Sequence, residues 1–325
     1  MINTGFKQVR NNRGLIRRGP FYRPPARLAI RLALLVIFTL HFISCGGRSD
    51  SVQQQGEPPG ETYRPYELLC DPASTGPLVA AHRGAHNSVP ENSLAAIREA
   101  ARLGADFAEI DVRSTQDGVL ILMHDNNLSR TTGFSAEVSA TTYAQISELT
   151  LLDGNSSNQE TLKVPTFAEA LSLARETGIM LYVDVKTDRD DLVAAVVQAG
   201  PYYDAALLRV YPDQALRMRA LDADLLMMPI AQTVDDLNAI LAVMPEIRIV
   251  ELNKGSPDAE FCAAARNAGV KVQQDVIGWP DIAAVLGNYD EWAKFAYAGV
   301  WLLQTDQPEL LIPAARTYRQ TGVFP

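Results

Sequence analysis

The sequence is poor in the residues that build zinc-stabilised folds. It has three cysteines and four histidines among 325 residues, and their spacing matches no structural zinc site. A GxGxxG motif is also missing after the first apolar run of the main domain, which argues against a dinucleotide-binding sheet. A zinc-stabilised domain and a dinucleotide-binding fold are therefore both disfavoured.

The first 44 residues lack acidic residues altogether. They contain eight Lys or Arg residues and end in the apolar run LALLVIFTLHFIS, directly before Cys45. This run is shorter than the roughly 20 apolar residues that a spanning helix needs. A basic segment followed by a short apolar run is typical of an export signal.

The sequence FISCGG resembles a bacterial lipobox, in which cleavage before the cysteine leaves its thiol for lipid attachment. Residues 1–44 are therefore predicted to be a lipoprotein-type signal peptide, with lipidation at Cys45. An ordinary signal peptide followed by a chance cysteine, and an uncleaved anchor, remain alternatives. All three place the rest of the chain outside the cytoplasm, and lipidation predicts a membrane-anchored protein of the bacterial cell envelope that faces the periplasm.

The exported part has a large excess of negative charge. Without the eight basic residues of the signal, 21 of the 29 Lys and Arg residues remain against all 38 acids, a formal net charge of −17. Such a surface repels polyanions, so nucleic acid is not expected as a partner. An anionic substrate would need a local metal ion or local Arg and Lys, and no protein partner is implied.

Residues 45–76 contain few apolar residues and are rich in Gly, Gln, Ser, Pro and Glu, which predicts a flexible tether. Cys70, at the end of this segment, and Cys262 could form a disulfide in an oxidising envelope. They are separated by nearly 200 residues, so the sequence leaves this pairing open.

From Pro77 onward, short apolar runs alternate with segments that carry helix start and stop signals. This alternation predicts parallel strands joined by helices, and eight or nine strands in about 240 residues fit a (β/α)8 TIM barrel over residues 77–325. The predicted strands are 78–81, 107–112, 119–123, 180–185, 207–210, 225–230, 247–252, 270–272 and 300–303.

A barrel collects its chemistry at the carboxyl ends of its strands. Polar residues follow or close several predicted strands: His82, Arg83, Glu109, Asp111, His124, Asp184 and Lys186. Glu109 and Asp111 are two residues apart in an extended segment, so their side chains share one face. Their mutual repulsion calls for a cation, and Asp184 would complete a site for a hard divalent ion, Ca²⁺ or Mg²⁺.

A resemblance to a known family gives these residues roles. The stretch AHRGAHNSVPENSLAAIREAARLGADFAEIDVRSTQDGVLILMHDNNLSRTT resembles the glycerophosphodiester phosphodiesterase signature, which runs HRG, PEN[TS], ExD and DGxxVxxHDxxLxRTT. The tail AGVWLLQTDQPELL is similar to the family's closing GVDGIITDxPxxL. Together the resemblance covers about residues 77–315.

The resemblance implies metal-dependent hydrolysis of small glycerophosphodiesters to glycerol 3-phosphate and an alcohol. It assigns general acid–base catalysis to His82 and His124, metal binding to Glu109, Asp111 and Asp184, and substrate contacts to Arg83 and Lys186. Glu91 is expected to brace Arg83 or approach the metal. A small insertion, about residues 134–165, is expected after the strand region that carries His124, as a cap over the pocket.

Some positions depart from the family pattern. Asp184 stands where the family has Glu in an ExK motif, and RVYP replaces a Ser-Phe after the next strand. His86 stands where a small or polar residue is common. These changes leave the alcohol of the substrate open. A related barrel that acts on another phosphodiester or on intact lipid, like a phospholipase D, and a non-catalytic barrel that binds phosphodiesters remain alternatives.

Overall fold

A computed structural model describes residues 64–152 and 163–325 of the chain. The predicted signal peptide, Cys45 and most of the predicted tether lie outside the described residues, so export and lipid attachment stay predictions. Within the described ranges, no helix is long and apolar enough to span a bilayer.

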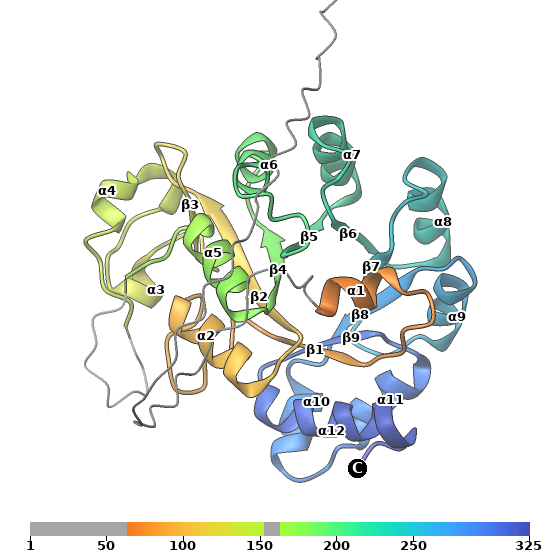
Figure 1. Cartoon of the computed structure of the whole chain (residues 1–325). Coiled ribbons are helices and arrows are strands. Elements are labelled where there is room, and N and C mark those ends of the chain that lie inside the picture. The colour runs from red at the N-terminus through yellow and green to blue at the C-terminus, as the bar shows by residue number, and fades with distance from the viewer. Residues whose placement is uncertain (1–63, 153–162) are drawn as a thin grey trace, which may run out of the picture. The chain divides into compact units, whose positions relative to one another are not determined.

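Eight parallel strands close into a barrel (Figure 1). The ring closes because β1 pairs in parallel with both β2 and β9. The (β/α)8 TIM barrel expected from the sequence is confirmed. Its strands are β1 (Leu78–Ala81), β2 (Phe107–Ser114), β4 (Met180–Val185), β5 (Ala206–Val210), β6 (Met227–Ala231), β7 (Ile249–Leu252), β8 (Lys271–Asp275) and β9 (Leu302–Thr305).

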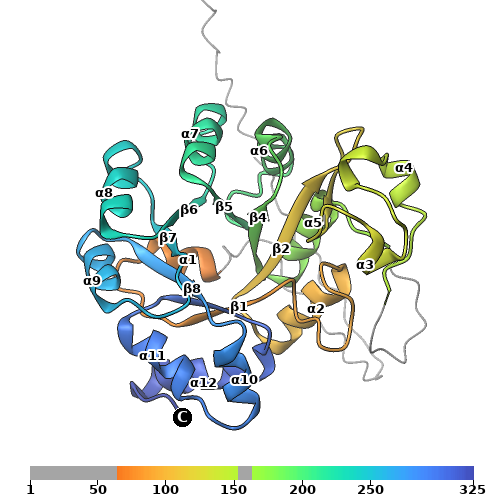
Figure 2. The same ribbon diagram turned by 180° about the vertical axis from the view of Figure 1, so that it is seen from behind.

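Helices surround this ring, as the view from behind also shows (Figure 2). Their starts follow from local sequence: the Ser93 hydroxyl accepts a hydrogen bond from the Ala96 amide, and Thr166 forms a capping box with Glu169. The helices of the ring are α2 (Leu94–Leu103), α5 (Phe167–Thr177), α6 (Asp190–Ala199), α7 (Pro212–Leu221), α8 (Val234–Val243), α9 (Ala259–Asn267), α10 (Trp279–Val285), α11 (Asp290–Ala298) and α12 (Pro308–Thr321).

Residues alternate between the inside of the barrel and the helix-facing side along each strand. One buried cluster fills the amino-terminal half of the interior, with Phe107, Met180, Leu207 and Ile249 contributed by four strands. The next inward positions along these strands carry polar groups. These polar side chains therefore lie beyond the buried cluster, toward the carboxyl-terminal mouth of the barrel.

One expected barrel strand was wrong, and one helical segment of the sequence is divided in two. The run 119–123 forms β3 (Leu120–Leu122), which pairs antiparallel with the end of β2 and is not a barrel strand. The segment WPDIAAVLGNYDEWAKF forms two helices, α10 and α11, with Gly287 between them at a φ of +85°. Glycine adopts this left-handed conformation without steric cost, so the chain can turn there.

The described part of the expected tether is packed, not flexible. Residues 64–70 form helix α1 (Arg64–Cys70), and Leu69 is buried in the cluster that contains Leu78 and Trp301. Cys70 and Cys262 are both free, so the disulfide left open by the sequence does not form in this structure.

An insertion between β3 and α5 carries its own small core. It contains α3 (Ser129–Thr132), a 3-10 turn η1 (Val138–Ala140) and α4 (Tyr143–Ile146). Their apolar side chains pack with those of β3 in a buried cluster separate from the main core. The predicted insertion, about residues 134–165, overlaps two of these elements, η1 and α4, and its residues 153–162 are outside the described part.

Candidate active site

Three carboxylates from two neighbouring strands meet at the mouth of the barrel. Glu109 and Asp111 occupy alternate positions of β2, and Asp111 lies directly opposite Asp184 of β4 in the strand register. One oxygen from each of the three lies within 4.8 Å of the others. Contrary to expectation, Glu109 and Asp111 do not end their strand, because β2 continues to Ser114 to pair with β3.

The carboxylates repel one another in a poorly solvated place. Burial raises the pKa of Glu109 well above its ordinary value, and the charges of Asp111 and Asp184 add to this shift. The Arg83 amide acts in the opposite direction by donating a hydrogen bond of 2.8 Å to Glu109 Oε2. A hard divalent cation takes oxygen ligands and would relieve this repulsion, so these residues fit such an ion.

Lys186 already offsets part of the negative charge. Its Nζ lies 3.0 Å from Asp111 Oδ1 and 3.3 Å from Asp184 Oδ2. Burial acts to lower the pKa of Lys186, but the charges of the two aspartates outweigh burial and raise it. Lys186 therefore stays charged between the two carboxylates.

Arg209, which the sequence reasoning missed, holds the other side of Asp184. Its Nη1 donates a hydrogen bond of 3.0 Å to Asp184 Oδ1, and its Nε and Nη2 both donate to Glu251 on β7. Tyr182 also reaches Glu251, with its hydroxyl 3.4 Å from Oε2. The sequence contained a signal for this role. Arg209, in the RVYP segment, follows Leu207 by two residues, so both side chains face the inside of the barrel.

This buried ion pair gives a stability prediction. Replacing Arg209 with Met would leave Glu251, which is 3% exposed, without its cation. We expect a loss of about 3 kcal/mol in the free energy of unfolding at pH 8, measured by urea denaturation. The matched control is Arg189→Met, which breaks an exposed pair with Asp191 and is expected to leave the free energy of unfolding nearly unchanged.

The loss caused by Arg209→Met is expected to shrink at pH 5. Burial raises the pKa of Glu251 even with Arg209 in place, and removing Arg209 raises it further. A folded-state pKa above the unfolded value means that folding favours the protonated acid, so stability is lost as the pH rises through that interval. Equal losses at pH 5 and pH 8 would contradict this assignment.

His82 lies beside the carboxylate cluster. It follows β1, and its Nε2 lies 4.0 Å from Glu109 Oε2. Its Nδ1 lies 2.7 Å from Asp306 Oδ1, after β9, which is the neighbouring strand of β1. Because Nδ1–H donates to Asp306, Nε2 keeps a lone pair on the side of the carboxylates.

Asp306 was not predicted as a site residue, although the closing TDQP motif contains it. Burial acts to raise its pKa, but hydrogen bonds from His82 and His86 lower it well below its ordinary value. The Asp306 amide donates a hydrogen bond of 2.8 Å to Asp281 Oδ2, and the Thr305 hydroxyl donates to Asp281 Oδ1. Burial raises the pKa of Asp281 to about 6.

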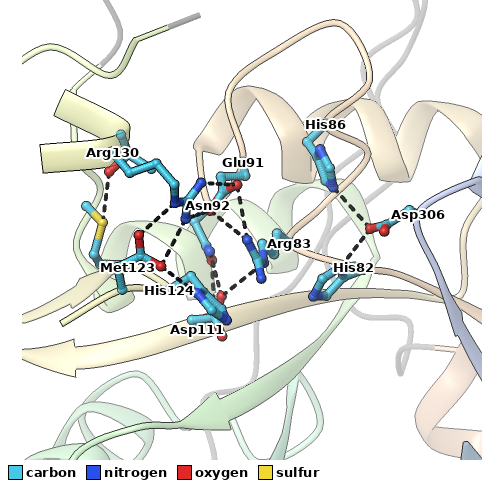
Figure 3. A network of polar contacts seen from close by, with 12 residues as sticks. His82, Arg83, His86, Glu91, Asn92, Asp111, Met123, His124, Arg130 and Asp306 are labelled. Carbon is cyan, nitrogen blue, oxygen red and sulfur yellow. Dashed lines mark hydrogen bonds and ion pairs between the residues drawn. The ribbon is translucent and has the colours of Figure 1, made fainter. Parts of the chain in front are cut away.

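His124 enters the site through a chain of ion pairs (Figure 3). Its Nδ1 lies 2.7 Å from Asp125, and Arg130 binds both Asp125 and Glu91. Glu91 in turn accepts hydrogen bonds of 3.0 and 3.2 Å from Arg83 Nη1. Of the two roles considered for Glu91, the structure therefore shows the bracing of Arg83.

Asn92 is a second residue that the sequence reasoning did not place in the site. Its side-chain amide donates a hydrogen bond of 2.7 Å to Asp111 Oδ2, and its carbonyl oxygen accepts one of 2.9 Å from the Asp111 amide. Asn92 adopts a φ of +52°, a conformation that Asn tolerates better than most residues. It fixes the orientation of the Asp111 carboxylate.

A cavity of about 410 Å³ opens beside these groups. It is lined by both Asp184 and Lys186, together with Arg113, Arg209 and Tyr211. Arg113 also holds the His124 carbonyl oxygen with hydrogen bonds of 3.0 and 2.8 Å. The cavity therefore gives a small polar molecule access to the carboxylate cluster at its Asp184 side.

Residues 82–227 match the sequence model of the Glycerophosphoryl diester phosphodiesterase family. Glycerophosphodiester phosphodiesterase 1 of Mus musculus is 34% identical over 149 residues, which cover 44% of this chain and 45% of that protein. A probable glycerophosphodiester phosphodiesterase 1 of Mycobacterium tuberculosis is 49% identical over 73 residues, 22% of this chain and 27% of that protein. The chain thus matches less than half the length of these curated relatives.

Solved structures share the fold. A glycerophosphodiester phosphodiesterase from Agrobacterium tumefaciens has a TM-score of 0.61 at 24% identity, covering 73% of this chain and 99% of that one. A phosphodiesterase from Oleispira antarctica, solved in complex with the product sn-glycerol-3-phosphate, has a TM-score of 0.61 at 22% identity, covering 73% and 96%. At these identities the likeness establishes the barrel.

Proposed function

We propose that the chain is a glycerophosphodiester phosphodiesterase, in line with the family model that matches residues 82–227, and that it hydrolyses glycerophosphodiesters to glycerol 3-phosphate and an alcohol. One observation carries the proposal. At the mouth of the barrel, an imidazole with a free ring nitrogen lies beside three clustered carboxylates and a charged lysine.

A phosphodiester resists hydrolysis because its charged oxygens repel a nucleophile. In the proposed mechanism, Glu109, Asp111 and Asp184 hold one divalent ion, Ca²⁺ or Mg²⁺, which when bound would neutralise phosphate charge. Lys186 and Arg83 add positive charge at the same place. Asp184 is one methylene shorter than the Glu of the family pattern. Its ion pairs with Arg209 and Lys186 keep its carboxylate directed at the other two acids.

The two histidines supply the proton transfers that the reaction needs. One proton must leave the attacking hydroxyl, and another must reach the departing alkoxide. His82 can accept a proton at Nε2 because Asp306 holds its Nδ1 hydrogen and stabilises the charged ring. His124 is similarly bound to Asp125 through Nδ1, so its Nε2 is the nitrogen available for the second transfer.

The reaction class, the ion and the alcohol can be tested together. Purified protein is incubated with glycerophosphocholine, glycerophosphoethanolamine, glycerophosphoglycerol or glycerophosphoinositol, with Ca²⁺, Mg²⁺ or a chelator. We expect glycerol 3-phosphate to be released from at least one substrate with one of the ions, and not with the chelator.

Two results of this panel would contradict the proposal. Release of a head group from intact phospholipid, included as a fifth substrate, but from none of the four diesters would identify the lipid-acting alternative. Binding of the diesters without turnover, under every ion condition, would identify a non-catalytic barrel. The Glu109→Gln variant, purified in the same way, is the control for contaminating phosphodiesterase.

A further inference from the structure

A second group of metal-ligating side chains meets beside the carboxylates. Among the described residues, His82, His86 and Asp306 each offer one ligand atom within 4.8 Å of the others. Asp306 Oδ1 lies 2.7 Å from His82 Nδ1 and 3.3 Å from His86 Nε2. Figure 3 shows both rings directed at this carboxylate, His86 from above and His82 from below in that view.

The three side chains are held in place and remain reachable from solvent. Asp281 fixes the Asp306 backbone, and the Ala85 amide donates to the Ala96 carbonyl oxygen, which anchors the loop that carries His86. The His82, His86 and Asp306 side chains are 16%, 26% and 33% exposed. A dissolved ion can therefore reach ligands that are already positioned.

The ligand set differs chemically from the carboxylate trio. Two imidazoles with one carboxylate suit Zn²⁺, whereas Ca²⁺ and Mg²⁺ prefer oxygen ligands alone. Bonds of about 2.0 to 2.2 Å in a tetrahedral zinc site place ligand atoms roughly 3.3 Å apart. The observed separations from Asp306 to the two rings are close to this value, so small side-chain movements would admit the ion.

We propose that His82, His86 and Asp306 form a second metal site that binds Zn²⁺ and thereby inhibits the enzyme. Binding is independent of the proposed function, whereas inhibition rests on it. Zn²⁺ at His82 Nδ1 takes the place of the hydrogen that Asp306 now accepts. In the neutral ring that hydrogen moves to Nε2, which then has no lone pair for accepting a proton.

Zinc binding can be measured directly by competition with a chromophoric zinc chelator. Excess Mg²⁺ is present to occupy the carboxylate trio. We expect the wild-type chain to bind Zn²⁺ and His86→Ala to bind it at least about tenfold more weakly. The matched control is Ser88→Ala, an exposed position in the same loop, which leaves all three ligands in place and is expected to bind as the wild type does.

Thermal melting followed by circular dichroism establishes that both variants are folded. Wild-type protein that takes up no Zn²⁺ under excess Mg²⁺ would overturn the proposal. Equal zinc affinity of the wild type and His86→Ala would overturn it as well. These outcomes are read without any enzymatic activity, so they stay decisive even if the proposed hydrolysis is not found.

Inhibition is then measured as glycerol 3-phosphate release against free Zn²⁺, with each rate expressed relative to the zinc-free rate of the same variant. We expect half-inhibition of His86→Ala to require at least about ten times more Zn²⁺ than the wild type, in line with its weaker binding. Identical inhibition curves for the two proteins would overturn the inhibitory role.

Discussion

His82→Ala is expected to lower kcat for glycerophosphodiester hydrolysis by about a thousandfold. General acid–base catalysis by one side chain contributes about 10² to 10⁴ in rate, and His82 Nε2 is the ring nitrogen that faces the carboxylates. The measurement is steady-state release of glycerol 3-phosphate. Because the side chain is partly exposed and loses one hydrogen bond, the melting temperature is expected to change little.

His124→Ala is expected to lower kcat by a similar factor. The choice of substrate distinguishes the roles of the two histidines. A diester with a good leaving group, such as p-nitrophenol, needs no proton on the departing oxygen. The histidine that protonates the natural alkoxide is therefore the one whose alanine variant recovers activity on the aryl ester. Ser88→Ala, at an exposed position in the loop after His86, serves as the control. If a histidine variant keeps most of its kcat, that histidine is not part of the mechanism.

Glu109→Gln is expected to abolish metal-dependent turnover while leaving the metal-free protein at least as stable as the wild type. The substitution removes one of three clustered carboxylates but keeps an oxygen that can accept the Arg83 hydrogen bond. Burial and the neighbouring aspartates raise the pKa of Glu109, so ionising it costs folding free energy. This cost is present above the pKa of Glu109 in the unfolded chain and grows as the pH rises toward its pKa in the folded protein. It is absent from the Glu109→Gln variant, because Gln does not ionise.

Three measurements check the Glu109→Gln prediction: kcat, divalent-ion affinity by calorimetry, and the urea midpoint in chelator at pH 8. The same substitution at Glu99, which is paired with Arg102 on the surface of α2, is the control and is expected to leave kcat and metal affinity unchanged. A Glu109→Gln variant that binds the ion as tightly as the wild type would show that the carboxylates do not hold it.

The barrel was predictable because its signals are local. Each strand is a short apolar run, each helix has a cap within a few residues, and the alternation of the two allows few folds. The clustering of Glu109, Asp111 and Asp184 was predictable for similar reasons. Residues two apart on a strand share a face, and the carboxyl ends of parallel strands lie at the same edge of the sheet. The antiparallel β3 was missed because its run has the composition of a barrel strand, and only its pairing differs.

The partners of these residues were not predictable, because they depend on closure of the ring. His82 and Asp306 are 224 positions apart and meet only when β1 pairs with β9. Arg209 reaches Glu251 across the barrel interior, from β5 to β7. Asn92 contacts Asp111 from a left-handed backbone conformation that a residue pattern does not reveal.

The most direct test of the central claim is a crystal structure of the protein soaked with Mn²⁺, with the ion located by anomalous scattering. Mn²⁺ accepts the same oxygen ligands as Mg²⁺ and Ca²⁺. The account predicts one peak within about 2.6 Å of an oxygen from Glu109, Asp111 and Asp184, on the side of His82 Nε2. The absence of a peak at these three carboxylates, or an ordered crystal with His82 turned away from them, would contradict it.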